Sequence, residues 1–556
     1  MESTESLNTY DAITLSILWA RLVAIVDEAG TILRRTSFST GTRESSDFAI
    51  VLMDTDGNSL AQSTTSVPSF MGVLPMLVRS LLAGNFPLAK WQPGDVVITN
   101  DPWLCAGAKA DVGIIAPVFR SQSDFGDIKL IGFMGCVAHS PDMGGILWGA
   151  GARDLYEEGL LIPPVKLYES GNQNQLILTL IEANVRAPQQ TIGDIRAQVS
   201  AIEQGVRSLM RMMDEYQMDN LEPLARQILD ASERAMREAI RKAPDGQYHY
   251  FYPIDGDGLN EPAFINCLVQ IQDDEITVDY DGTSGVHSLA INAAFNYVYA
   301  YTTYPIICVF SPDVPSNEGA LRPIRVSAPI GSLLNAQPPA PLGARYITGN
   351  LLQAPLFGAL AQAVPDLVQA DSGSACWSIV LHGQREIPVK TKTGVETQKI
   401  EFVEYCFLNG GYGARPTKDG VNVLSFPTNV ANVPIEVLER NAPILITEKS
   451  LRPGTGGAGK FRGGLGQVFS FKMVGTDPIT VSILTEKTKT VAHGMLGGEP
   501  GAAGAIISNR KLPPKGLARL YAGDEITLQL PGGGGYGLAS ERDPVATRRD
   551  NELGYS

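Results

Sequence analysis

The sequence predicts an α+β protein in which helical and strand-rich regions alternate along the chain. Three observations support this fold class. A helical pattern begins at Asp11, the segment 194–243 has apolar residues at helical spacing with charges between them, and the sequence after about 420 is almost wholly strand and turn. A chain of 556 residues is long enough for about three or four domain-sized units.

The elements can be followed from the N-terminus. Asp11 is the expected N-cap of the first helix, and residues 47–54 are expected to form a strand that leads into a turn at Asp56-Gly57-Asn58. Residues 95–145 contain strand-like segments separated by loops rich in Gly, Pro and Asp. One set of apolar residues predicts the buried face of the first helix: Ile13, Ile17, Leu18, Leu22, Ile25 and Val26.

Long helices are expected over 194–243, ending at Pro244-Asp245-Gly246. Strands return from 247, with further helices near 290–310 and 347–364. We therefore divide the chain into three regions that can form one intertwined body. They are an N-terminal α+β region with the helical segment (1–245), a middle α+β region (246–420) and a Gly-rich β region (421–556). Both ends are polar, and we expect them to be mobile or to lie along a partner.

Charge and cysteine usage restrict the function classes. The 44 Lys and Arg against 59 Asp and Glu give a net charge of -15, so the overall field repels nucleic acid and anionic membranes. The six cysteines are scattered without a C-x-x-C pair, which favours a reducing cytoplasm over a disulfide scaffold. The apolar run after Asp11 is interrupted by Arg21 and is too short to cross a bilayer, so we expect a core helix there.

The stretch "GTGGAGK" at 454–460 has the spacing of a phosphate-binding loop. Such a loop needs a Ser or Thr after the Lys and a helix directly behind it, whereas Phe461 and a Gly-rich, strand-like segment follow here. The sequence therefore favours tight β-turns over a nucleotide site.

One constellation of polar residues points to chemistry. His139 follows a strand-like run and lies three residues before Asp142, and a second strand-end loop holds Asp101 and Asp111. An imidazole among carboxylates suits a divalent ion such as Mn²⁺, Fe²⁺ or Zn²⁺, although an isolated H-x-x-D pair is more often a loop-ordering hydrogen bond. Glu157 and Glu158 are expected to be solvated.

A set of ordered motifs resembles the hydantoinase B family, from about Asp47 to Pro544. That family comprises B subunits or regions of ATP-dependent hydantoinases, oxoprolinases and caprolactamase, and the corresponding subunits of acetone and acetophenone carboxylases. The motifs are "PGDVVITNDPW", "AHSPDMGG", "YEEGLLIPPVKLY", "GDIRAQ", "INAAFNYVYA", "VPSNEGALRPI", "GGYGARPTKDG", "NVPIEVLER", "LRPGTGGAGKFRGGLG" and "GGGGYG".

The resemblance implies a large, multi-lobed hydantoinase B-like fold and a division of labour. An A-type partner with an actin-like ATPase fold would use ATP and Mg²⁺ to phosphorylate an amide or enolate oxygen. The B-type chain, as part of a hetero-oligomer, would then bind the activated species. ATP would belong to the partner and not to the Gly-rich stretch.

The resemblance also implies a metal pocket. Asp111 matches the Asp of the family's Gly-Thr-His-x-x-Asp loop, His139 and Asp142 match its His-His-x-Asp loop, and Asp47 matches a strand Asp. These four residues are the predicted metal ligands, for Zn, Mn or Fe.

The sequence departs from the family pattern in both loops. Ala108 or Lys109 stands at the first loop's His, and Ser140 replaces the second His of the pair. Imidazoles are the ligands that retain borderline metals, so the loss of these His residues should weaken metal binding. Two interpretations follow. Either the four residues hold a weaker metal, or Lys109 supplies a fixed ammonium that stabilises an oxyanion. An exposed loop lysine is the plain alternative.

The prediction is a B-type subunit of a hydantoinase or oxoprolinase complex that hydrolyses cyclic amides. We assign catalysis to His139, Asp142 and Lys109, and substrate binding to Asp101 and Asp111. A subunit of a biotin-independent ketone carboxylase and a scaffold subunit with a decayed metal site are the alternatives.

Overall fold

The computed structural model describes residues 10–121, 128–373, 376–391, 394–424 and 426–556, and all that follows concerns these residues. The predicted mobile segment 1–8 lies outside them. Helices and strands are mixed throughout, with several separate sheets, so the α+β prediction is confirmed. None of the described helices is long and apolar enough to span a membrane.

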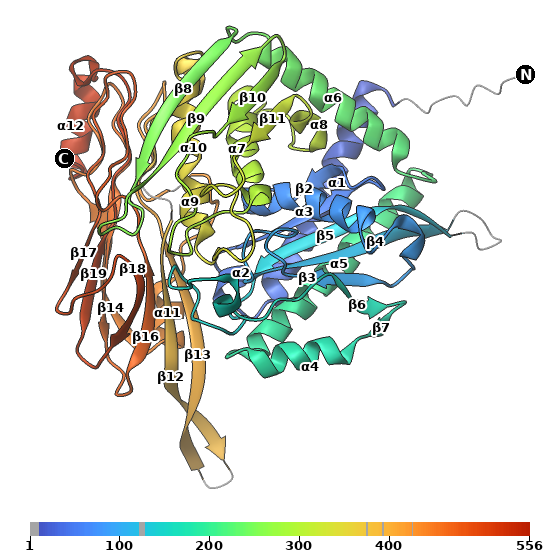
Figure 1. Ribbon diagram of the computed structural model, residues 1–556, viewed down its shortest axis with the longest axis horizontal. Coiled ribbons are helices and arrows are strands. Elements are labelled where there is room, and N and C mark those ends of the chain that lie inside the picture. Colours follow the sequence, from blue (N-terminus) through green and yellow to red (C-terminus); the bar gives the residue numbers. More distant parts are fainter. Residues whose placement is uncertain (1–9, 122–127, 374–375, 392–393, 425) are drawn as a thin grey trace, which may run out of the picture.

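A seven-stranded antiparallel sheet forms the N-terminal part of the molecule, in the order β2-β1-β5-β4-β3-β6-β7 (Figure 1). Its two long central strands pair so that the first residue of β4, Asp111, lies opposite the last residue of β5, His139. The strands are β1 (Phe48–Met53), β2 (Ser59–Gln62), β3 (Val96–Thr99), β4 (Asp111–Ser121), β5 (Ile128–His139), β6 (Val165–Glu169) and β7 (Asn172–Gln173).

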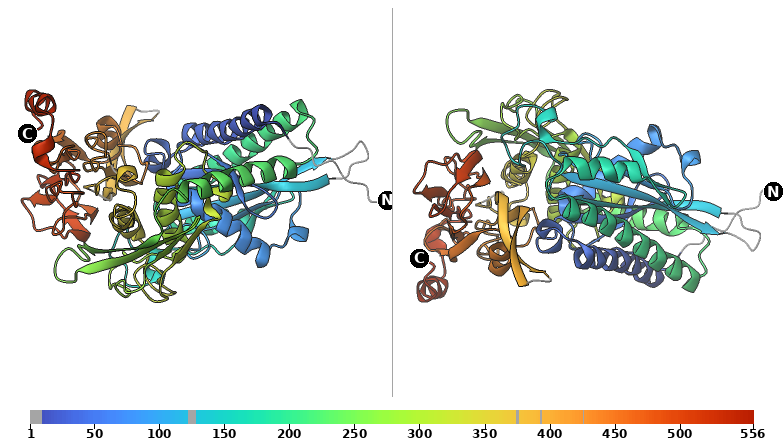
Figure 2. Two further views of the ribbon diagram at one scale, coloured as in Figure 1. Left: turned by 90° about the horizontal axis from the view of Figure 1, so that it is seen from above. Right: turned by 90° about the horizontal axis from the view of Figure 1, so that it is seen from below.

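Helices cover both faces of this sheet because its central strands are apolar on both sides. Phe48, Ile50 and Leu52 of β1 pack in one core with α1 (Ala12–Thr36), α5 (Pro188–Glu215) and α6 (Glu222–Ile240). The alternate residues of β1 pack on α3 (Pro68–Ala83) instead. Figure 2 shows the long helices α1 and α5 side by side.

Helix α1 begins where the sequence predicts, and the Asp11 carboxylate accepts hydrogen bonds from Ile13 N and Thr14 N. Its buried face is shorter than predicted. Leu18, Leu22, Ile25 and Val26 are buried, but Ile13 is 74% exposed and Ile17 48% exposed, because both lie on the solvent-facing side of the helix with Ala20 and Ala24.

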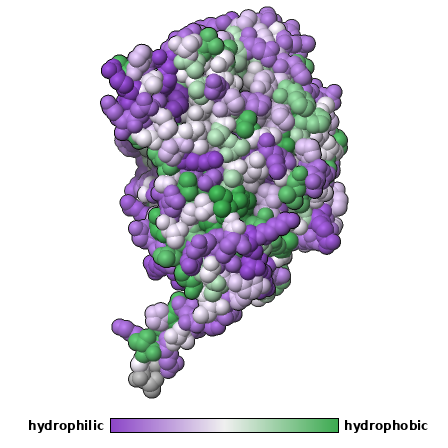
Figure 3. All heavy atoms as spheres, turned by 90° about the vertical axis from the view of Figure 1, so that its left-hand side faces the viewer, coloured by the Kyte–Doolittle hydropathy of each residue, from purple (hydrophilic) through white to green (hydrophobic). Residues whose placement is uncertain are grey.

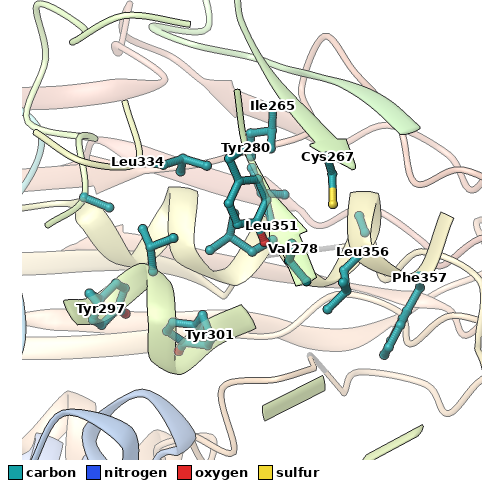
Figure 4. Close-up of a cluster of buried hydrophobic side chains, with 14 of the residues drawn as sticks. Ile265, Cys267, Val278, Tyr280, Tyr297, Tyr301, Leu334, Leu351, Leu356 and Phe357 are labelled. Atoms are coloured by element: carbon teal, nitrogen blue, oxygen red, sulfur yellow. The ribbon is translucent and has the colours of Figure 1, made fainter. Parts of the chain in front are cut away.

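A second sheet, in the order β11-β10-β9-β8, covers the helices of the middle region. Tyr297 and Tyr301 of α7 (Phe295–Phe310) lie beneath Val278 of β10 and Tyr280, the residue just after it, with Leu351 between them (Figure 4). The other elements are β8 (Gly246–Ile254), β9 (Ala263–Gln272), β10 (Glu275–Asp279), β11 (Ile324–Ser327), α9 (Arg345–Leu351) and α10 (Gln353–Leu360).

Two four-stranded sheets, β13-β12-β16-β18 and β14-β15-β19-β17, share one core in the C-terminal part. Strands β12 and β13 extend beyond it as a hairpin that projects from the body (Figures 1 and 3). The sheet β13-β12-β16-β18 contains strands from both sides of residue 420. The predicted division of the chain into three regions stays a prediction. The strands are β12 (Trp377–Thr391), β13 (Gly394–Leu408), β14 (Ile444–Arg452), β15 (Gly466–Met473), β16 (Ile479–Leu484), β17 (Ala505–Ser508), β18 (Lys515–Leu520) and β19 (Glu525–Gln529).

The C-terminal end is not a free tail. Asp543 caps α12 (Pro544–Glu552), and Arg542 pairs with Asp419 and Asp550, which fixes the helix to the body. The remaining short elements are α2 (Thr40–Arg43), α4 (Gln175–Asn184), α8 (Glu318–Leu321), α11 (Ile435–Asn441), η1 (Leu88–Lys90), η2 (Leu155–Glu158), η3 (Pro365–Leu367) and η4 (Ala539–Glu541).

The Gly-rich stretches pack backbone against backbone. Gly457 N donates to Gly533 O at 2.8 Å, Gly533 N to Gly464 O at 2.9 Å, and Gly464 N to Tyr412 O at 2.8 Å. A Cβ built on Gly463 would lie 1.9 Å from Gly533 O, so no side chain fits there. These amides are already bonded to carbonyls, and no helix follows residue 460 before β15 begins. The structure therefore agrees with the turn reading.

Candidate functional site

Asp111 and His139 form the centre of the site, at the edge where β4 begins and β5 ends. Their pairing across the sheet places His139 Nδ1 2.8 Å from Asp111 Oδ1, and both side chains are buried. Two residues 28 positions apart in sequence thus become one hydrogen-bonded pair through strand register alone.

Arg345 completes this pair from a distant part of the chain. Its guanidinium makes a close ion pair with the second oxygen of Asp111, and its Nε donates to Ala106 O at 2.8 Å. The guanidinium also lies over the ring of Tyr297, 4.3 Å from the centroid. Sequence reasoning missed Arg345, because nothing near it in the sequence indicates that α9 reaches the start of β4.

The arrangement fixes the proton on the imidazole. Asp111 accepts hydrogen bonds at both oxygens, so His139 Nδ1 carries a hydrogen, and in the neutral imidazole Nε2 is the nitrogen that keeps its lone pair. His139 Nε2 is buried and, within the part of the chain that the structure describes, has no hydrogen-bond partner. The imidazole can therefore accept a proton at Nε2.

An inner cavity of about 40 Å³ lies against this imidazole. Asp47, the residue just before β1, also lines this cavity. Burial, opposed by His139 and reinforced by Asp111, raises the pKa of Asp47 to about 6. The cavity walls include Asp47, His139, Trp148, Tyr297, Arg345 and Asn350.

An outer cavity of about 30 Å³ contains the other predicted residues. Lys109, Asp142 and Glu158 line it, and Trp148 lines both cavities. The Trp148 ring lies edge-on to His139, with centroids 4.9 Å apart, and stacks on Tyr346 at 5.2 Å. Trp148 is thus the partition between the two spaces.

Lys109 and Asp142 are both engaged in hydrogen bonds to the protein. Lys109 is 3% exposed, and its Nζ donates to Leu155 O at 2.6 Å and Gly159 O at 2.7 Å. Asp142 pairs with the Arg186 guanidinium and also accepts from Arg186 N. The exposed-lysine alternative is therefore wrong, and Lys109 serves first to hold the turn η2.

Glu158 differs from the solvated residue that the sequence predicts. Its Oε1 accepts from Leu342 N at 2.5 Å and Gly343 N at 2.6 Å, while its Oε2 is buried without a partner among the described residues. Burial, partly opposed by these two amides, raises the pKa of Glu158 to about 7. Glu157 beside it pairs with Arg153 at the surface.

Asp101 lies apart from both cavities. Its carboxylate accepts from Trp103 N at 3.0 Å and so stabilises the loop between β3 and β4. The residues that line the two cavities do not include it. Asp101 thus helps to shape the loop before Asp111. Its role in substrate binding stays a prediction.

The residues present do not fit the predicted four-ligand metal site. Arg345 and His139 take both oxygens of Asp111, and Asp142 is turned into the outer cavity toward Arg186. In the described ranges, no group of three or more His, Cys, Asp or Glu side chains is placed to hold a metal ion. A guanidinium thus occupies the side of Asp111 that a ligated cation would need.

Comparison with known proteins relates nearly the whole chain to one family. The family model described as hydantoinase B/oxoprolinase matches residues 11–539. The B subunit of a putative D-/L-hydantoinase from Pseudomonas sp. (strain NS671) is 31% identical over 578 residues, which span 99% of this chain and 94% of that protein.

Two solved structures have the same fold. The ATP-dependent caprolactamase from Pseudomonas jessenii matches with a TM-score of 0.85 and 27% identity, over 99% of this chain and 95% of that one. A nucleotide-free acetone carboxylase chain matches with a TM-score of 0.84 over 98% of this chain and 78% of its own length. At 17% identity, the second match speaks for the fold alone.

Proposed function

The chain belongs to the hydantoinase B/oxoprolinase family, and from this premise we propose that it is the B-type subunit of an ATP-dependent cyclic amidase. An A-type ATPase subunit phosphorylates the lactam oxygen, and this chain hydrolyses the activated ring. The related hydantoinase protein and the caprolactamase support such a complex. The six cysteines, none in a disulfide, agree with a cytoplasmic location.

The single observation that carries the proposal is the Arg345–Asp111–His139 chain, which ends at an unpartnered Nε2 beside a cavity. Arg345 holds Asp111, Asp111 orients the imidazole, and Nε2 faces no competing donor among the described residues. This is the arrangement that general-base activation of water requires.

The chemistry balances with a single imidazole. Water adds to the carbon of the phosphorylated imidate while Nε2 takes one proton and returns it to the ring nitrogen. Nε2 then transfers the proton of the newly added hydroxyl group to the ring nitrogen while the C–N bond breaks. The ring opens to an acyl phosphate and an amine. A second water then attacks the acyl carbon, and phosphate leaves.

The outer cavity has a supporting role in this proposal. Burial lowers the pKa of Lys109, opposed by Glu158 and Asp154, and its ammonium lies near the partly protonated Glu158. Asp142 holds Arg186, and with it the loop that follows His139. We assign these residues to the entry of the substrate and give the proton transfers to His139.

Coexpression with an A-type ATPase tests the proposal. We expect ATP-dependent ring opening of lactams or hydantoins by the complex and no ATP hydrolysis by this chain alone. Turnover of ketones that depends on bicarbonate would favour a carboxylase subunit instead. Activity that survives both His139→Ala and Asp142→Asn would indicate a scaffold.

Metal analysis of the purified complex tests the ligand set separately. The ion pair on Asp111 predicts a complex without stoichiometric Zn, Mn or Fe. A stoichiometric metal that is lost on His139→Ala would restore the predicted ligands Asp47, Asp111, His139 and Asp142.

A further inference from the structure

The inner cavity contains several polar atoms that have no partner in the described protein. They are His139 Nε2 and both amide atoms of Asn350, Nδ2 and Oδ1. Asn350 is only 1% exposed. A buried polar group without a hydrogen bond is unfavourable, so an amide with neither atom satisfied indicates a ligand or ordered water in this cavity.

Asn350 lies on the cavity wall that α9 provides, one helical turn after Tyr346 and on the same short helix as Arg345. Apolar side chains also line the cavity, including Val67, Phe70 and Phe407. They offer Asn350 no hydrogen bond, so its carboxamide is left free to bond a group inside the cavity.

The chemistry of a carboxamide selects the ligand. Asn presents one donor and one acceptor side by side, which match a group with an acceptor and a donor on the same edge. A secondary amide inside a small ring is held cis, so its C=O and N–H lie on one edge. An open-chain secondary amide is trans and turns them to opposite sides. A ketone or a carboxylate offers acceptors only.

We propose that Asn350 recognises the cis-amide edge of a small lactam or hydantoin ring in the inner cavity. The inference rests on the proposed function and names the group by which this chain selects its substrate. The cavity of about 40 Å³ is lined by both Asn350 and His139, so an amide edge held by Asn350 lies in the same space as the proposed general base.

A carboxamide also suits the activated substrate. Phosphorylation of the lactam oxygen converts the ring nitrogen from a donor into an acceptor. Asn350 can turn over about its last side-chain bond and present Nδ2–H₂ to that nitrogen. The same residue therefore serves the ring before and after activation, which an apolar side chain cannot do.

The test measures binding to the full chain, without ATP or partner, by ligand-observed NMR. The probes are 2-pyrrolidinone, N-methyl-2-pyrrolidinone, cyclopentanone and open-chain N-methylacetamide. We expect 2-pyrrolidinone to bind about tenfold or more tightly than the other three. In Asn350→Leu this preference is lost, whereas Phe407→Leu, a change elsewhere in the lining of the same cavity, affects all probes alike.

Thermal melting separates recognition from folding. Because Asn350 has no partner in the described protein, we expect Asn350→Leu to melt at or above the wild-type temperature. The inference is overturned if 2-pyrrolidinone fails to bind, if the wild type shows no preference, if Asn350→Leu keeps it, or if that variant melts well below the wild type. An Asn350-dependent preference in a chain whose complex opens no ring would refute the proposed function alone.

Discussion

Asp111 joins three elements of the site through one carboxylate. It lies at the start of β4, accepts from His139 at the end of β5, and pairs with Arg345 from α9. A buried carboxylate is tolerated only when its charge is balanced and its oxygens accept hydrogen bonds. The guanidinium does both, and in doing so it orients the imidazole.

Removal of the guanidinium should leave that carboxylate buried and unpaired. We expect Arg345→Met to lower the free energy of unfolding by about 3–5 kcal/mol. The double variant Asp111→Asn/Arg345→Met should recover part of the loss, because the buried charge is then gone. Urea unfolding measures both, and an Arg345→Met protein as stable as the wild type would show that the ion pair does not form.

Glu158 predicts a pH dependence of stability. Its folded pKa of about 7 lies above the ordinary value of 4.5 because burial disfavours the carboxylate. The folded state therefore binds the proton more tightly, and this group lowers the free energy of unfolding as pH rises from about 4.5 to about 7. Above pH 7 its contribution is constant.

The matched variant pair isolates this effect. Glu158→Gln, which keeps an acceptor for Leu342 N and Gly343 N, should be more stable than the wild type at about pH 8 and similar at about pH 4.5. Glu157→Gln, at the surface, should follow the wild-type curve between these pH values. Parallel curves for wild type and Glu158→Gln would contradict the burial of this charge.

At the scale of elements, the Gly-rich segments replace side-chain packing by direct contact of backbones. Gly463 shows the constraint most clearly, since a Cβ there would lie 1.9 Å from Gly533 O. Both segments in this contact are fixed by amide-to-carbonyl bonds and have little freedom to move apart.

A single methyl group tests this packing. Gly463→Ala should lower the free energy of unfolding by about 1–3 kcal/mol or more, because the backbone must shift to admit it. Gly285→Ala is the control, since a Cβ there would meet no atom within 4 Å. Equal stability of the two variants in urea would contradict a tightly packed Gly core.

Local sequence patterns predict much of the fold and, within the site, the pair Asp111 and His139. The N-cap at Asp11 locates α1, the strand-like apolar segments locate β4 and β5, and the loops at Asp111 and His139 suggest a shared region at the strand ends. The two residues are indeed adjacent, through antiparallel register.

What the sequence does not predict depends on tertiary packing. Arg345 and Asn350 reach the site because α9 packs beneath it, although α9 follows His139 by about two hundred residues. The Glu158 carboxyl group is held by two amides of a loop near residue 342, which no local pattern around it indicates. Asp142 keeps its predicted position in the loop but turns to Arg186, so proximity in sequence did not give a shared cavity.

At the scale of the whole molecule, our proposal gives this chain the hydrolytic site and gives the nucleotide chemistry to a partner. The family relationship and the match to an ATP-dependent caprolactamase support this division, as do the amides of Gly454, Gly457 and Lys460, which are bonded to backbone carbonyls. The two activities should therefore be separable by a change at one residue of this chain.

The most direct test compares ATP consumption with ring opening in the complex that carries His139→Gln. We expect ADP to form at a rate near that of the wild type, while ring-opened product falls by about 100-fold or more, because the general base is lost after the activation step. A parallel loss of both rates, or ring opening at the wild-type rate, would contradict the assignment of His139.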